Sequence, residues 1–75
     1  MNAEEIFKQL GFMEVKEHTS MFAIKVYKKG LNYIYFDYDG NIDIGCLIIT
    51  PQLLKAINRQ VEEFRQVEEL RQAYE

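Results

Sequence analysis

The chain has 75 residues, 48% of them hydrophobic, and a formal net charge of −3. This length allows one domain, residues 1–75, and the apolar content excludes an intrinsically disordered chain. A single cysteine excludes an internal disulfide, and a single histidine excludes the usual Cys/His zinc sites. The acidic balance makes nucleic acid an unlikely ligand.

The N-terminal stretch, MNAEEIFKQLGF, predicts a protein that is neither exported nor inserted in a membrane. It has acidic residues where a signal peptide carries positive charge. No apolar run approaches the roughly 20 residues that span a bilayer. We therefore expect a cytoplasmic protein with no membrane partner.

Residues 2–10 predict a short helix. Asn2 is suited to cap it, Glu5 occupies the reciprocal position of a capping box, and Ile6 and Phe7 share an apolar face. Gly11 is expected to end the helix, because glycine adopts the left-handed conformation common after a helix C-terminus.

Residues 12–49 predict four antiparallel strands, because the hydrophobic period changes to two. Three-residue turns that end in Gly30 and Gly40 pair even-numbered residues with even-numbered ones. The first strand is expected over residues 12–17, with its inward-facing register left open and a short loop at residues 18–20. The alternation directs one apolar set into the core: Phe22, Ile24, Val26, Ile34, Phe36, Ile42, Ile44, Cys46 and Ile48.

The same registers place polar and aromatic side chains on the opposite, uncovered face of the sheet. Lys25 is expected opposite Tyr33, and Tyr35 opposite Asp43. A half-wet sheet face rich in tyrosine is suited to contact another protein. The residues predicted to bind a partner are Tyr27, Tyr33, Tyr35, Asp37 and Asp43.

Thr50-Pro51 predicts the start of a second helix, with an N-cap followed by proline at the first helical position. No glycine or proline interrupts residues 52–74. The predicted fold class is therefore α+β: a four-stranded antiparallel meander with a short N-terminal helix and a long C-terminal helix on one face.

The end of this second helix predicts self-association. Leu53, Leu54, Ile57, Val61 and Phe64 form an apolar stripe, but Val67, Leu70 and Tyr74 continue it roughly 100° or more around the cylinder. The helix should be about 35 Å long, whereas a domain of this size is about 30 Å across. We expect the last turns to overhang and to meet a second copy, as a homodimer, or another protein. A frayed helix end is the alternative.

The stretch FDYDGNIDI, residues 36–44, invites a catalytic or metal-binding interpretation. Asp37, Asp39, Asn41 and Asp43 follow the spacing that starts a calcium loop, but the loop's glycine and terminal glutamate are missing. The stretch also resembles the first motif of haloacid-dehalogenase-type phosphatases, whose parallel sheet needs crossovers that this chain has no room for. We interpret it as a hairpin turn around Asp39-Gly40, with a weak metal site over residues 37–43 as an alternative.

No residue pattern predicts an enzyme or a cofactor site. His18 lies in a predicted turn without a catalytic partner, and Cys46 is expected in the core. Lys25, Tyr27, Tyr33 and Tyr35 together resemble an aromatic platform, so binding of single-stranded nucleic acid remains an alternative function.

Three stretches, AEEIFKQLGF, YIYFD and ITPQLLKAINRQVEEF, resemble small uncharacterised proteins encoded by prophages and mobile elements of Gram-positive bacteria. The resemblance implies a cytoplasmic accessory protein and transfers no catalytic or binding residue. With the overhanging helix, it favours a non-enzymatic protein–protein interaction module as the function.

Overall fold

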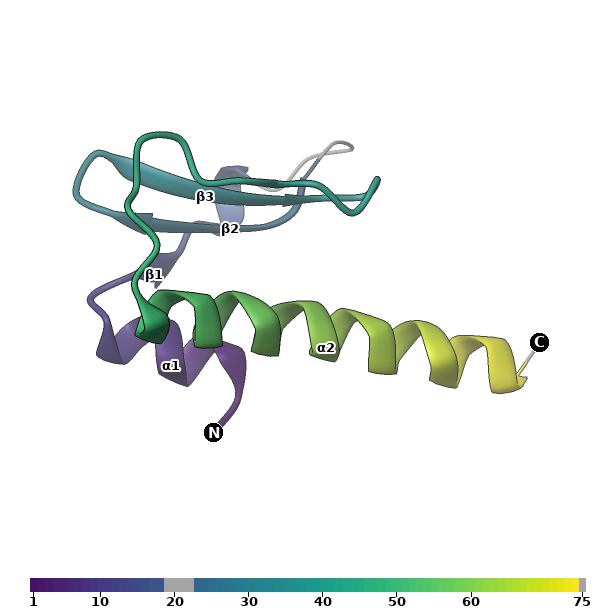
Figure 1. The fold of residues 1–75 in the computed structure, drawn as a ribbon. Coiled ribbons are helices and arrows are strands. Elements are labelled where there is room, and N and C mark those ends of the chain that lie inside the picture. Colours follow the sequence, from purple (N-terminus) through teal and green to yellow (C-terminus); the bar gives the residue numbers. More distant parts are fainter. Residues whose placement is uncertain (19–22, 75) are drawn as a thin grey trace.

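The computed structural model describes residues 1–18 and 23–74 and has the α+β architecture predicted from the sequence (Figure 1). A four-stranded antiparallel meander, in the order β1-β2-β3-β4, lies above a layer made of two helices. Helix α2 packs against α1 within that layer. The elements are α1 (Ala3–Gln9), β1 (Met13–Glu14), a 3₁₀ turn η1 (Lys16–His18), β2 (Ala23–Lys29), β3 (Asn32–Asp37), β4 (Ile42–Asp43) and α2 (Pro51–Tyr74).

Both helices begin where their capping residues predict. The Asn2 side chain accepts a hydrogen bond from the backbone N–H of Glu5 at 2.8 Å, and Thr50 Oγ1 accepts one from Leu53 at 3.1 Å. These bonds satisfy amide donors that have no partner inside the first turn. Gly11, with a φ of +90°, follows the end of α1 as expected.

The β3–β4 hairpin has the predicted register and turn. Tyr35 pairs with Asp43, and the amide of Asp37 donates to the carbonyl of Asn41, which encloses a three-residue loop. Gly40 closes that loop with a φ of +86°, a conformation that side chains with a Cβ rarely adopt.

The predicted register of β2 against β3 is wrong. Lys29 pairs with Asn32, so the loop contains two residues, with Gly30 first and a φ of +61°. Odd-numbered residues of β2 therefore pair with even-numbered residues of β3. Tyr27 pairs with Ile34 and points to the helices, whereas Val26 moves to the opposite face.

A β-bulge near the start of β2 then turns Ala23 to the face predicted for it, away from the helices. Ile24 and Lys25 together oppose Phe36, and Ala23 pairs with Asp37 on the face away from the helices. Lys25 is consequently opposite Phe36, and Lys28 takes the place opposite Tyr33 that was expected for Lys25.

The first strand is shorter than predicted. β1 spans only Met13–Glu14, after which the chain turns into η1, and residues 19–20 of the predicted loop lie outside the described part of the chain. Phe12 is buried in the main core, whereas Val15 is buried in a second cluster with Ala23 and Val26. Of the two registers left open, the structure therefore has the one in which Phe12 and Glu14 face the helices, and not the one in which Met13 and Val15 do.

The fourth strand is also short, and its predicted core positions are partly wrong. β4 ends at Asp43, and the chain turns at Gly45, with a φ of +59°, toward α2. Cys46 is exposed rather than buried, and Ile48 is 84% exposed. The alternation in residues 44–48 does not continue the strand because the backbone has left the sheet.

Nine buried side chains form the main core between sheet and helices: Ala3, Phe7, Phe12, Tyr27, Ile34, Phe36, Leu53, Ala56 and Ile57. Phe7 stacks on Tyr27 with ring centroids 4.0 Å apart and an interplanar angle of 20°. The core thus joins α1, β2, β3 and the first half of α2.

Candidate protein-binding groove

Two of the three carboxylates of FDYDGNIDI, those of Asp37 and Asp43, accept hydrogen bonds that stabilise turns. Asp37 Oδ1 accepts hydrogen bonds from the amides of Asp39 at 3.0 Å and Asn41 at 2.8 Å, and Asp43 Oδ1 accepts one from Gly45 at 2.9 Å. Such bonds stabilise tight turns. Across residues 1–18 and 23–74, no three His, Cys, Asp or Glu side chains lie together in a way that could hold a metal ion. The hairpin interpretation of this stretch is confirmed.

We call the surface formed by Val26, Tyr33, Tyr35, Asp37 and Asp43 the tyrosine face. Tyr33 and Tyr35 are half-buried and stack with centroids 5.9 Å apart, and the Lys28 Nζ lies 5.6 Å from the Tyr33 ring centroid. Four of the five predicted partner-binding residues therefore share this face.

Tyr27 is not on the tyrosine face, and its predicted exposure is wrong. It is fully buried, and its hydroxyl donates a 2.6 Å hydrogen bond to Gln60 Oε1. Burial raises the pKa of Tyr27 far above its usual value of 10.0, and Glu14, Glu4 and Glu63 raise it further. Because Lys25 also leaves this face, the four-residue platform predicted for nucleic acid is not assembled.

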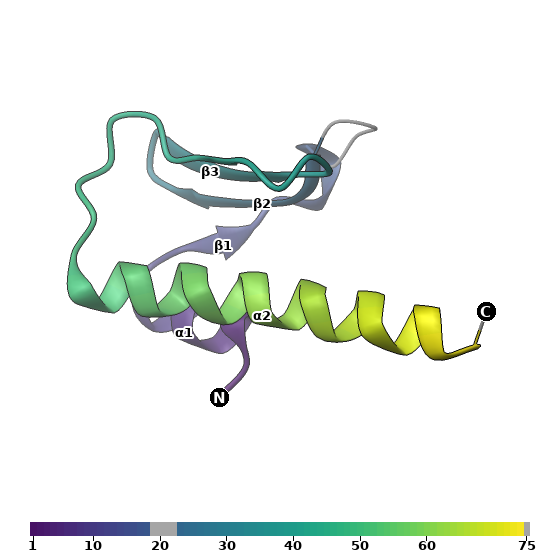
Figure 2. The same cartoon turned by 45° about the vertical axis from the view of Figure 1, so that its right-hand side comes forward.

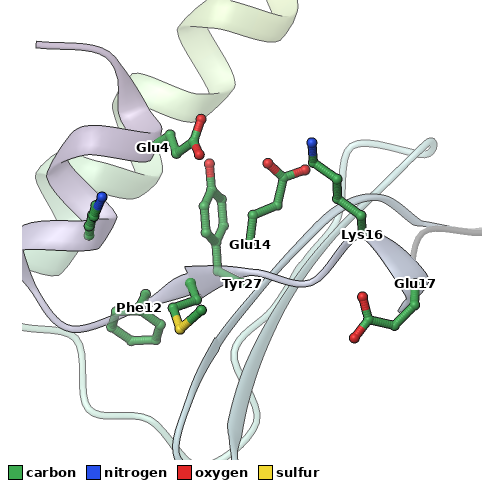
Figure 3. Close-up of a pocket in the computed structure, with 8 residues that line it drawn as sticks. Glu4, Phe12, Glu14, Lys16, Glu17 and Tyr27 are labelled. Carbon is green, nitrogen blue, oxygen red and sulfur yellow. The ribbon is translucent and has the colours of Figure 1, made fainter.

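Beside Tyr27 lies an open pocket of about 380 Å³, in which the ring stands between Glu4 and Glu14 (Figure 3). Lys8 and Lys16 also line it, so carboxylates and amines are mixed around the opening. The Tyr27 hydroxyl is already engaged with Gln60. This pocket therefore belongs to the structural anchoring of Tyr27 and presents no unpartnered buried polar group.

A larger hollow, of about 700 Å³, lies between α2 and the β3–β4 hairpin, and we call it the groove. Phe36 and Phe64 lie edge to face at its floor, with ring centroids 5.7 Å apart. The hairpin wall includes Ile42, and the helix wall includes Val61 and Val67. The full lining is Ile24, Phe36, Asp37, Tyr38, Gly40, Asn41, Ile42, Val61, Phe64, Arg65, Val67 and Glu68.

The groove exists because the two halves of α2 have different surroundings. Figures 1 and 2 show α1 beside the first half of α2, while the second half extends past α1, first beneath the β3–β4 hairpin and then beyond it. We call residues 51–60 the packed half and residues 61–70 the projecting half. On the projecting half, Val61 is 44% exposed, Val67 63% and Leu70 60%.

An ion pair lies on the projecting half. Arg65 Nη2 lies 2.5 Å from Glu62 Oε2, and this hydrogen bond lowers the pKa of the Glu62 carboxyl and raises that of the Arg65 guanidinium. Both side chains are exposed, so the pair contributes little to folding. The pair holds the Arg65 guanidinium beside the Glu62 carboxylate.

The sequence predicted an exposed end of α2 but no groove. Val67 and Leu70 are exposed, as expected. Tyr74 belongs to α2, but its side chain is outside the described part of the structure. Val61, predicted in the core stripe, lines the groove instead, and Ala56 and Gln60 take the buried positions. The hairpin wall depends on tertiary contacts and left no signal in the sequence.

Comparisons with models of protein families, with curated proteins and with solved structures found no match to this chain. Among the described helices, none is long and apolar enough to cross a membrane.

Proposed function

We propose that this chain is a non-enzymatic protein–protein interaction module that binds through the groove and the projecting half of α2. The observation that carries the proposal is that Val61, Val67 and Leu70 are exposed beside an apolar hollow of about 700 Å³. Such a surface on a small domain marks an interaction site, because burying it gains roughly 25 cal/mol per Å² of apolar area.

The bound chain is either another protein or a second copy that forms a homodimer. The tyrosine face, with Tyr33, Tyr35, Asp37 and Asp43, is a second proposed contact surface. The resemblance of the two helices and of YIYFD to prophage-encoded proteins supports a role as a cytoplasmic accessory protein of a phage or mobile element.

The test compares the wild-type chain with Val67→Asp, which puts a charge into the groove, and with Leu31→Asp as a matched control. Leu31 is 93% exposed in the β2–β3 turn and does not line the groove. We expect light scattering, or affinity capture from a Gram-positive bacterial lysate, to show an association lost in Val67→Asp and kept in Leu31→Asp.

A Tyr33→Ala variant in the same experiments reports on the tyrosine face. If Val67→Asp changes neither the mass in solution nor any captured protein, the groove is not the interaction site and the proposal fails.

A further inference from the structure

Within the helix layer, α1 reaches only the start of the projecting half of α2. The N-terminal end of α1 is fixed by a 2.6 Å hydrogen bond from the Ala3 amide to Glu63 Oε2. Beyond this point α1 no longer accompanies α2 (Figure 2), and Val67 and Leu70 lie exposed. The groove is thus bounded by α2 and the hairpin, and none of the described residues continues α1 alongside the projecting half.

The projecting half of α2, which forms one wall of the groove, carries a net negative charge. Residues 61–70 contain four glutamates and one arginine, a net charge of −3, which equals the formal charge of the entire chain. The seven basic and seven acidic residues of residues 1–61 balance. Glu68 and Arg65 line the helix wall of the groove, and Arg65 is paired with Glu62.

We infer that the groove binds a basic amphipathic helix of another protein, which lies along α2 where α1 ends. This inference rests on the proposed function and names the kind of partner. The projecting half is about 15 Å long at 1.5 Å per residue, so an apolar stripe at positions i, i+3, i+4 and i+7 matches its length. Basic residues flanking that stripe meet the glutamates of the projecting half.

Two other occupants fit the same surface less well. A second copy would bring two segments of charge −3 together, and like charges oppose association. An added β-strand would need an extended free edge, but β4 contains only Ile42–Asp43, and the chain turns at Gly45.

The test uses two synthetic 14-residue peptides with the same leucine stripe at helical spacing. One carries lysine at its polar positions and the other carries glutamate. Binding to the intact chain is measured by fluorescence anisotropy at low salt and at about 0.5 M salt, where the Debye length is only a few ångströms. We expect the lysine peptide to bind at least tenfold more tightly than the glutamate peptide, with an affinity that falls as salt rises.

Variants distinguish binding in the groove from general attraction between opposite charges. Val67→Asp adds a negative charge, so purely electrostatic binding would strengthen, whereas binding in the groove should weaken at least tenfold. Leu31→Asp adds the same charge away from the groove and should leave groove binding within a factor of about two. The double variant Glu68→Gln/Glu69→Gln should weaken binding several-fold and reduce its dependence on salt.

The inference is overturned if neither peptide binds, if both bind equally, or if Val67→Asp binds the lysine peptide as tightly as the wild type does. A dimer in light scattering that Val67→Asp dissociates would make the second copy the occupant. That result would refute the basic partner while supporting the proposed function. Far-UV circular dichroism of each variant verifies that the fold is retained.

Discussion

The packed and projecting halves of α2 differ in surroundings more than in composition. Leu53, Ala56, Ile57 and Gln60 are all at most 6% exposed because α1 and the sheet cover them. Val67 and Leu70 belong to the same helix and are about 60% exposed. Hydrophobic residues at helical spacing therefore identify an apolar face but do not say whether this chain or another one covers it.

The largest expected contrast comes from the same substitution in each half. Leu53→Ala should lower the free energy of unfolding by about 2–5 kcal/mol, because it leaves a cavity in the main core. Leu70→Ala should change it by less than about 0.5 kcal/mol. Urea unfolding monitored by circular dichroism measures both.

Since a domain of this size has a total stability of only about 4–11 kcal/mol, Leu53→Ala approaches the limit of folding. Equal losses for the two variants would mean that Leu70 is covered within a single chain, and the distinction between the two halves would be lost.

Gln60, the last buried residue of the packed half, tests whether its hydrogen bond with Tyr27 stabilises the fold. Tyr27→Phe removes the donor that Gln60 accepts from at 2.6 Å and should cost about 1–3 kcal/mol, because a buried amide oxygen loses its partner. The double variant Tyr27→Phe/Gln60→Leu removes both polar groups and should recover most of this loss. Full additivity of the two substitutions in urea unfolding would show that the hydrogen bond has no net role.

The pH dependence of stability gives a smaller effect from the same contact. Because the folded protein raises the pKa of Tyr27, the protonated hydroxyl stabilises the fold fully below pH 10, and this contribution falls as pH rises above that value. The difference in unfolding free energy between wild type and Tyr27→Phe should shrink by at most about 1.4 kcal/mol from pH 9 to pH 11. Titration of other tyrosines and lysines affects both proteins and cancels in the difference. A constant difference would contradict the raised pKa.

Local chemistry in the sequence was sufficient to predict both helices and one hairpin. Asn2 and Thr50 satisfy the first amides of their helices within three residues, and Gly40 closes the β3–β4 turn next to Asp37. These interactions span few positions, so they are encoded where they act. The α+β class follows from them together with the change of hydrophobic period at residue 12.

Tertiary packing decided the register of β2 against β3, because the local sequence is compatible with two different turns. The segment Lys28 to Leu31 fits a three-residue turn with Gly30 last or a two-residue turn with Gly30 first, and both are common in hairpins. The second turn brings Tyr27 onto Phe7 and within reach of Gln60, contacts 20 and 33 residues away that no local pattern reveals. The β3–β4 hairpin lies over α2, and this tertiary arrangement creates the groove. The sequence alone determined the two helices, the order of the strands and the β3–β4 turn. The packing of α1, the sheet and α2 determined which side chains face one another and which remain exposed.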